Sequence, residues 1–142
     1  MAVLTEKRNI SAAEVAVLNN KYKDLSITGR IAELYKDFNQ AEIMLTSSFA
    51  ATSAFLLKFF SEVNQDQLVY FIDTGYHFEE TLEYKQKLTE LYGLKVKSIS
   101  AVKEEHEFTI HDQTWKKNPD LCCQINKVKP IDLIKAKYTL WV

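Results

Sequence analysis

The two cysteines of the chain, Cys122 and Cys123, are adjacent in the sequence. Consecutive Cα atoms lie about 3.8 Å apart. This is shorter than the usual disulfide separation of roughly 4.4–6.8 Å, so a structural disulfide between them is disfavoured. Adjacent thiolates can instead ligate different irons of one iron–sulfur cluster, which usually takes four sulfur ligands. The pair therefore predicts half of a cluster's ligand set.

Other uses of the cysteine pair stay open at this point. Both residues could be reduced thiols with a purely structural role. Lys127 and Lys129 follow closely, and positive charge of this kind favours thiolate chemistry. His106 and His111 would complete a zinc site with two cysteines and two histidines, although their spacing matches no standard zinc finger.

A second candidate site is the hydroxyl-rich segment Thr46-Ser47-Ser48, followed by Phe49 and Ala50. It lies between an apolar run that predicts a buried strand and a segment that predicts a helix. A helix N-terminus presents unpaired N–H groups and the positive end of its dipole, so the segment suits a phosphate or sulfate. An ordinary Ser/Thr helix cap is the alternative, and the absence of glycine weakens the anion site.

A third candidate is Asp73-Thr74-Gly75, directly after a second apolar run. In open α/β sheets the carboxyl ends of the strands face the ligand crevice. There an aspartate can hold a ribose, an amine or a metal ion, and Gly75 permits a sharp turn. The alternative is an ordinary turn or helix cap. His77 follows within reach of the same edge, although a lone histidine is more often incidental.

The elements that would carry these residues begin with a helical lead-in over residues 1–40. Ser11 and Glu14 have the spacing of a capping box, which predicts a helix from there to about Lys23. Apolar residues recur at helical spacing over 28–38 and predict a second helix. We expect both helices to pack on the core that follows.

Residues 41–142 predict an α/β core. Strands are expected at 43–45, 68–72, 94–99 and 138–142, and helices at 49–63, 79–92 and, in turns interrupted by Pro130, 122–135. Leu82, Leu88 and Leu91 are expected to face inward, and Gly93 to end its helix. This order predicts a parallel sheet with right-handed crossovers. A final strand without a following ligand loop suggests a domain shortened at its C-terminus.

The composition narrows the class of protein. A chain of 142 residues predicts a single domain. With 18 basic and 19 acidic residues, the charge gives no indication of nucleic-acid binding. No apolar run approaches the roughly 20 residues of a membrane span, and no secretory signal opens the chain. A reducing cytoplasm is therefore expected. An exposed final strand would allow copies to pair as a homo-oligomer.

In this order the three motifs resemble those of the sulfonucleotide reductases, the adenylylsulfate and phosphoadenylylsulfate reductases of assimilatory sulfate reduction. Thr46-Ser47-Ser48-Phe49 resembles the family's modified pyrophosphatase (PP) loop. Asp73-Thr74-Gly75, with Phe78-Glu79-Glu80-Thr81 after it, resembles the family's Asp-Thr-Gly segment. Cys122-Cys123 through Lys127-Val128-Lys129-Pro130 resembles the Cys-Cys-x-x-Arg-Lys-Val-x-Pro motif of members with a [4Fe–4S] cluster.

The resemblance covers about residues 41–142 and implies a three-layer α/β domain of the adenine-nucleotide α-hydrolase-like (PP-loop or HUP) type. It implies reduction of adenylylsulfate or its 3′-phosphorylated form to sulfite, with thioredoxin or glutaredoxin as electron donor. The resemblance implies that Cys122 and Cys123 ligate the cluster and that Lys127 is catalytic. The residues that it implies for substrate binding are Thr46, Ser47, Ser48, Phe49, Asp73, Thr74 and Gly75.

The chain departs from the family pattern at Ala50, Glu79 and Asn126, where the family commonly has glycine, proline and arginine. The family also continues with an Arg-rich loop, a Cys-x-x-Cys pair that completes the cluster, and a segment bearing the nucleophilic cysteine. The 142 residues alone are therefore expected to be inactive as a reductase. Two alternatives remain: a PP-loop ATP-pyrophosphatase-type adenylating or sulfur-transfer enzyme, and a non-catalytic nucleotide-binding remnant.

Overall fold

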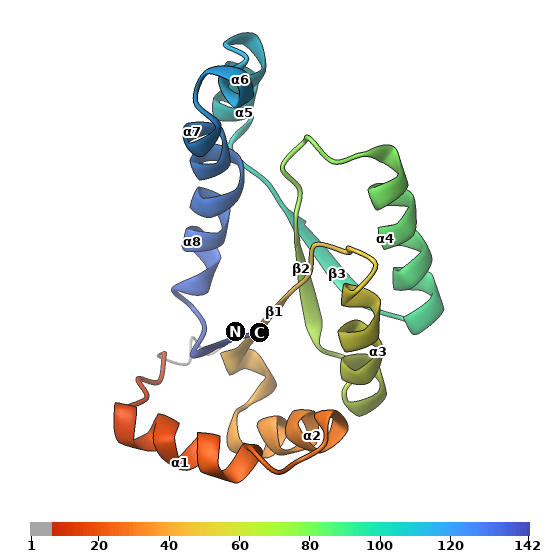
Figure 1. Ribbon diagram of the computed structural model, residues 1–142, viewed down its shortest axis with the longest axis vertical. Helices are drawn as coiled ribbons and strands as arrows, with labels where there is room; N and C mark the ends of the chain where they lie inside the picture. The colour runs from red at the N-terminus through yellow and green to blue at the C-terminus, as the bar shows by residue number, and fades with distance from the viewer. Residues whose placement is uncertain (1–6) are drawn as a thin grey trace, which may run out of the picture.

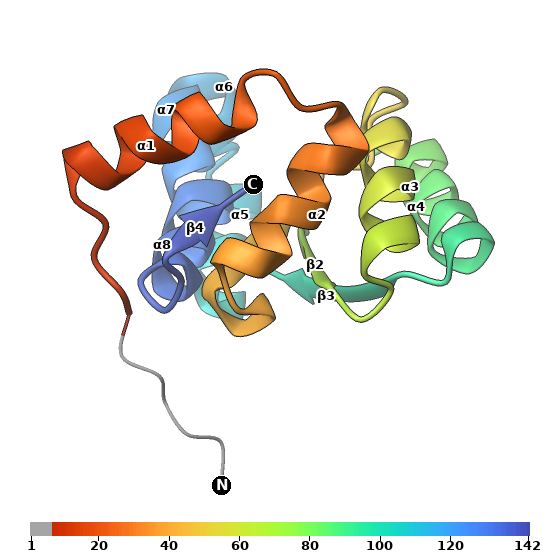
Figure 2. The same ribbon diagram turned by 90° about the horizontal axis from the view of Figure 1, so that it is seen from below.

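The computed structural model describes residues 7–142 and has a four-stranded parallel sheet at its centre (Figure 1). The strand order is β3-β2-β1-β4, with bounds Ile43–Thr46 for β1, Leu68–Ile72 for β2, Lys95–Ile99 for β3 and Leu140–Trp141 for β4. Figures 1 and 2 show α3 and α4 on one side of the sheet and α5 to α8 on the other. The predicted three-layer α/β class is confirmed.

The two central strands form the core because their side chains are apolar on both faces, as parallel strands covered by helices require. Leu45 of β1 pairs in register with Val69 of β2, and both are buried. Phe71 of β2 is fully buried as well. β3 is half exposed, as its alternating sequence predicts.

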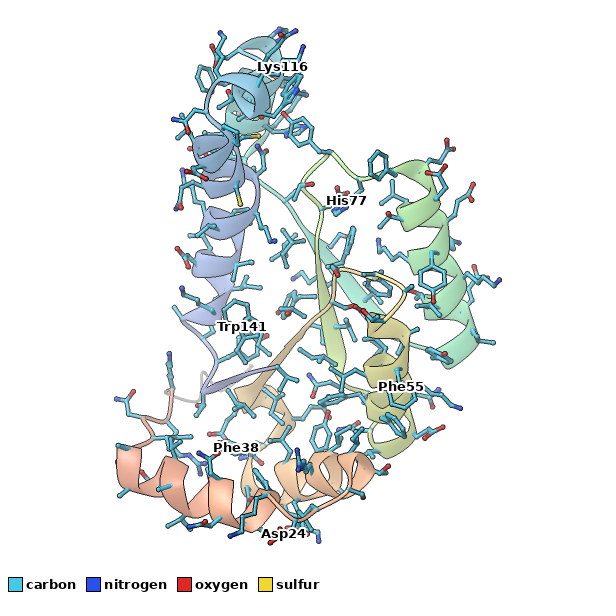
Figure 3. The ribbon with its side chains drawn as sticks, in the orientation of Figure 1. Asp24, Phe38, Phe55, His77, Lys116 and Trp141 are labelled. Atoms are coloured by element: carbon cyan, nitrogen blue, oxygen red, sulfur yellow. The ribbon has the colours of Figure 1, made fainter. Side chains whose placement is uncertain are left out.

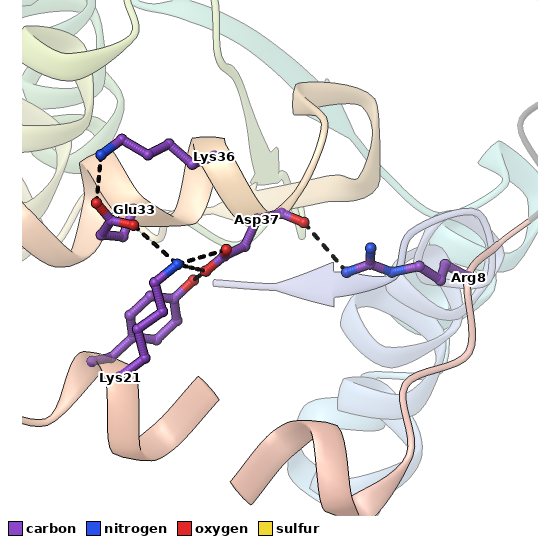
Figure 4. Close-up of polar contacts among 6 residues, drawn as sticks. Arg8, Lys21, Glu33, Lys36 and Asp37 are labelled. Carbon is purple, nitrogen blue, oxygen red and sulfur yellow. Dashed lines mark hydrogen bonds and ion pairs between the residues drawn. The ribbon is translucent and has the colours of Figure 1, made fainter. Parts of the chain in front are cut away.

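Both helices predicted within the lead-in are present, and residues 1–6 of that segment lie outside the described residues. Helix α1 spans Ala12–Tyr22 and begins with the predicted capping box, in which the Ser11 hydroxyl accepts from Glu14 N–H and the Glu14 carboxylate accepts from Ser11 N–H. Helix α2 spans Ile27–Asp37 and buries Ile31 against the core. Figure 4 shows the polar contacts by which Lys21 of α1 joins the two helices.

Helix α3 (Ser53–Val63) starts later than predicted. The expected start at Phe49 is wrong because Phe49 has a φ of 53°, outside the helical region, and its ring packs edge-to-face on Phe71 in the core. Helix α4 (Glu79–Tyr92) ends at Gly93, as predicted, with a φ of 62°. The prediction that Leu82 and Leu91 face inward is wrong, since both are exposed; only Leu88 is buried.

The remaining helices form an arm beside the sheet: α5 (Lys103–His111), α6 (Thr114–Lys117), α7 (Pro119–Cys123), a π-helical turn η2 (Gln124–Val128) and α8 (Lys129–Lys135). Neither α5 nor α6 was predicted. The expected interruption at Pro130 is wrong, because the helical backbone runs through it. The π turn widens the helix where the proline ring would otherwise meet a carbonyl of the preceding turn. Within residues 7–142, no helix has the length and apolar character needed to span a membrane.

Candidate functional site

The hydroxyl-rich loop and the Asp-Thr-Gly loop leave neighbouring strands at the same edge of the sheet. Ser47 N–H donates to the Tyr70 carbonyl at 3.0 Å, and Asp73 N–H donates to the Ile99 carbonyl at 2.8 Å. The ladder hydrogen bonds thus continue to the first residue of each loop. This edge is where ligands bind in open parallel sheets.

A cavity of about 280 Å³, here called the serine cavity, opens at this edge. It brings together residues of both loops with residues of the helical arm and the last strand. Its lining consists of Thr46, Ser47, Ser48, Ile72, Thr74, His77, Lys127, Ile131 and Trp141. Figure 3 labels two of them, His77 after β2 and Trp141 in β4.

The three hydroxyls of the loop have different roles. The Ser47 hydroxyl accepts from Phe49 N–H at 3.0 Å, and the Ser48 hydroxyl accepts from Ala50 N–H at 3.4 Å. Each serine therefore retains its own proton for donation to a ligand. The Thr46 hydroxyl instead donates to the Val142 carbonyl at 3.4 Å and accepts from the Trp141 indole.

Helix α3 begins at Ser53, five residues after Ser48. Its N-cap is Thr52, whose side chain makes no capping hydrogen bond, so the ordinary-cap alternative for the loop is wrong. The expected helix terminus directly after Ser48 is likewise absent from the described residues 7–142. The serine cavity is lined by the serines of the loop and by no residue of α3.

A second cavity, of about 370 Å³, lies beside the cysteines and is here called the cysteine cavity. Its lining consists of Thr74, Tyr76, Trp115, Pro119, Cys122, Cys123, Asn126 and Lys127. Both cysteines are free thiols; Cys122 is buried and Cys123 is exposed. Two unbridged thiols on one cavity fit half of the ligand set of an iron–sulfur cluster.

Lys127 lies between the two cavities and lines both, as does Thr74. Among residues 7–142, no carboxylate lies within ion-pair distance of the Lys127 amine, whereas Lys129 pairs with Glu105. The positive charge of Lys127 is therefore available to a bound anion. Lys129, the other lysine of the motif, is engaged elsewhere.

Asp73 and Gly75 line a third cavity, of about 270 Å³, which faces α5 rather than the serine loop. The Asp73 carboxylate accepts from Gly75 N–H at 3.0 Å, which closes a tight turn. Gly75 has a φ of 75°, and a Cβ there would collide with the His106 ring. Of the three residues in this predicted motif, Thr74 is the one that lines the serine and cysteine cavities.

Strand β4 and the residues just before it are held beside the site by two aromatic contacts that the sequence did not indicate. The Trp141 indole donates to the Thr46 hydroxyl at 3.0 Å. The hydroxyls of Tyr138 and Tyr70 lie 2.7 Å apart. Burial, together with this hydrogen bond, raises the pKa of Tyr138 well above its ordinary value. No local signal in the sequence marks Trp141 as a residue that lines a cavity.

The zinc alternative has no ligand set in the part of the chain that the structure describes. No group of three or more His, Cys, Asp or Glu side chains gathers within residues 7–142. His106 instead has its Nδ1 2.8 Å from the Asn126 side-chain oxygen, so this ring nitrogen is already engaged.

Comparisons with known proteins agree on one family. The family model described as the phosphoadenosine phosphosulfate reductase domain matches residues 42–142. An adenosine 5′-phosphosulfate reductase of Mesorhizobium japonicum is 38% identical over 135 residues, which are 92% of this chain and 51% of that protein. One of Halalkalibacterium halodurans is 32% identical over 111 residues, 76% of this chain and 48% of that protein.

A solved structure supports the same fold. The crystal structure of the phosphoadenylyl-sulfate reductase from Candida auris, a phosphate complex, matches with a TM-score of 0.74 and 25% identity. The match covers 89% of this chain and 63% of that one. The chain spans about half the length of the curated relatives named above.

Proposed function

The chain belongs to the phosphoadenosine phosphosulfate reductase family, and we propose that it binds an adenosine phosphosulfate across the serine and cysteine cavities, for reduction to sulfite. The observation that carries this proposal is the position of Lys127, which lines both cavities. A single cation there can contact a sulfate whose phosphate partner lies by the serines and whose sulfur lies toward the cysteines.

The phosphosulfate is held by the serine cavity in this proposal. Ser47 and Ser48 each have a hydroxyl proton to donate, and the Lys127 amine, which pairs with no carboxylate among residues 7–142, supplies charge. Hydrogen bonds to charged groups are stronger than neutral ones and favour an anionic ligand. Phe49 and Thr46 support the loop, the first through its buried ring and the second through its bond to Trp141.

Cys122 and Cys123 are proposed to hold two corners of a [4Fe–4S] cluster in the cysteine cavity. Because the chain has two cysteines, the other two ligands would come from outside it. When bound, the cluster would bring thiolate charge close to the substrate sulfate. Lys127 then offsets repulsion between these like charges, which is electrostatic stabilisation of the kind that accelerates group transfer.

The reaction proposed for the whole enzyme transfers the sulfuryl group in two steps. A cysteine thiolate attacks the sulfate sulfur, the S–O bond to phosphate breaks, and the adenosine phosphate leaves with the bonding electrons. The resulting S-sulfocysteine is then reduced by the dithiol of thioredoxin or glutaredoxin, which becomes a disulfide as hydrogensulfite and the cysteine thiol are released. If Cys122 and Cys123 hold the cluster, the attacking cysteine is a third one, outside this chain.

Calorimetric titration of the chain with four nucleotides tests this proposal: adenosine 5′-phosphosulfate, its 3′-phosphorylated form, AMP and ATP. We expect one or both phosphosulfates to bind most tightly. Preferential binding of ATP would instead support a PP-loop ATP-pyrophosphatase-type enzyme. Absence of binding by all four would contradict the proposed site.

A further inference from the structure

The side chain of Asn126 lies buried between the Asp-Thr-Gly loop and the cysteine pair, with 2% of its surface exposed. Its amide nitrogen lies 3.0 Å from the carbonyl oxygen of Cys122 and 3.6 Å from the sulfur of the same residue. It also lies 3.1 Å from the Thr109 hydroxyl. Its oxygen lies 2.8 Å from His106 Nδ1. Every polar atom of this buried amide therefore has a partner.

The surrounding hydrogen bonds determine which way the amide faces. The Thr109 hydroxyl donates its one proton to the His106 carbonyl at 2.7 Å. It can therefore only accept from Asn126 and from the Tyr76 hydroxyl. The Cys122 carbonyl can likewise only accept. The amide nitrogen must therefore face Cys122, and its oxygen must face His106, which donates from Nδ1.

We infer that Asn126 is a positioning residue for Cys122: its amide nitrogen, whose two protons serve the Cys122 carbonyl and the Thr109 hydroxyl, also lies against the Cys122 sulfur and holds that thiol in an environment that the adjacent thiol does not share. Cys123 is an exposed residue, and within residues 7–142 no hydrogen-bond donor to its sulfur is present. This difference between the surroundings of the two cysteines follows from the contacts alone. Its effect on the reduction potential of a bound cluster, which hydrogen bonds near the ligand sulfurs tune, rests on the proposed function.

The contacts of Asn126 also join the helical segment that carries the two cysteines to the Asp-Thr-Gly loop. The His106 ring, which donates to the Asn126 oxygen, packs so closely against Gly75 that a Cβ at position 75 would collide with it. Tyr76, the next residue, donates to Thr109, which also orients Asn126. The Asp-Thr-Gly loop and the Cys122 sulfur are thus separated by one layer of hydrogen-bonded side chains. Arginine, which the family commonly has at position 126, could not accept from His106.

Cluster-free protein provides a test that does not depend on the proposed function. The chain is treated with iodoacetamide at fixed pH, and alkylation of Cys122 and Cys123 is followed separately by peptide mass spectrometry. Asn126→Leu removes the donor at similar volume, and Asn126→Asp replaces it with a carboxylate. Asn20→Leu and Asn20→Asp make the same changes at an exposed residue of α1. Cys123 is the internal reference in every sample.

The contacts of Asn126 hold Cys122 in its buried position, where iodoacetamide reaches it slowly. We therefore expect the Cys122-to-Cys123 rate ratio to rise about threefold in Asn126→Leu, and further in Asn126→Asp, whose carboxylate repels the Cys122 carbonyl. Both Asn20 variants should keep the wild-type ratio. An unchanged or lowered ratio in both Asn126 variants would overturn the inference, because leucine fills the same space without these hydrogen bonds.

A measurement on the unmutated chain covers the case in which the variants fold poorly. The Asn126 side-chain amide protons are observed by ¹H–¹⁵N NMR before and after the thiols are capped with methyl methanethiosulfonate. We expect slow hydrogen exchange and a signal that moves when Cys122 is capped. Exchange as fast as that of the exposed Asn20 amide, or a signal unaffected by capping of Cys122, would contradict the inference.

Discussion

Thr74 and Lys127 are shared by the two cavities, since each residue lines both. One comes from the loop after β2 and the other from the π-helical turn, 53 positions later in the chain. Because both residues line both cavities, the serine loop and the cysteine pair belong to one region. The predictions below test whether that region works as a single ligand site.

The two tryptophans offer separate reporters for the two cavities, since Trp141 lines the serine cavity and Trp115 the cysteine cavity. In Trp115→Phe and Trp141→Phe, the one remaining indole should change its emission on titration with adenosine 5′-phosphosulfate, with the same Kd in both. A response from the Trp115→Phe protein alone would mean that the ligand occupies only the serine cavity.

Ser48→Ala should weaken binding of the same nucleotide about tenfold, because it removes an available donor to a charged group. The exposed Ser48 hydroxyl has only a long hydrogen bond, 3.4 Å, to its own loop, so the fold should be little affected. Ser61→Ala on α3, whose hydroxyl donates to the Lys58 carbonyl, is the matched control and should bind normally. Equal affinities of the two variants for the nucleotide would show that the Ser48 hydroxyl does not bind it.

Gly75→Ala should lower the free energy of unfolding by about 2 kcal/mol or more, since the positive φ is strained for alanine and its Cβ would collide with the His106 ring. Denaturant unfolding followed by circular dichroism measures this. Gly29→Ala in α2 is the control. Its backbone is helical, so the effect should be small. A Gly75→Ala protein as stable as Gly29→Ala would refute the packing described here.

The contacts in Figure 4 predict a dependence of stability on pH. Hydrogen bonds from Lys21 and then Tyr22 hold the pKa of the Asp37 carboxyl below its ordinary value. A lowered folded-state pKa stabilises the fold above the unfolded pKa of about 3.9, and this stabilisation is lost as the pH falls through the folded value. Asp37→Asn should therefore be less stable than wild type at pH 6 and lose less stability on acidification.

Unfolding by urea at several pH values between 6 and 2 checks this prediction. Asp24→Asn, at the exposed turn between α1 and α2 (Figure 3), serves as the control and should follow the wild-type curve. If Asp37→Asn and wild type lose stability in parallel, the contacts of Lys21 and Tyr22 with Asp37 do not link the two helices in solution.

The sequence predicted the elements whose local signals are strong. Apolar runs identified β1 and β2, and the capping box and Gly93 identified one end each of α1 and α4. Local signals failed where tertiary packing decides the backbone. The ring of Phe49 enters the core and delays α3, and a π turn accommodates Pro130 within a continuous helix.

Individual residues of the candidate site could be predicted from the sequence, but the contacts between them could not. Ser47, Ser48, Thr74, Lys127 and the cysteines were identified by type and spacing. The contact of Trp141 with Thr46 joins residues 95 positions apart, and no spacing rule indicates it. Asn126 was noted only as a departure from the family pattern, and its role became visible once its partners on α5 were known.

The affinity of Lys127→Met for adenosine 5′-phosphosulfate, measured by titration calorimetry, tests the central claim most directly. Lys129→Met removes the same charge two residues away, from a lysine that pairs with Glu105 and lines neither cavity. We expect Lys127→Met to weaken binding about tenfold or more and Lys129→Met to bind within about twofold of wild type. Equal affinities of the two variants, or no binding by the wild-type chain, would contradict a sulfonucleotide site centred on Lys127.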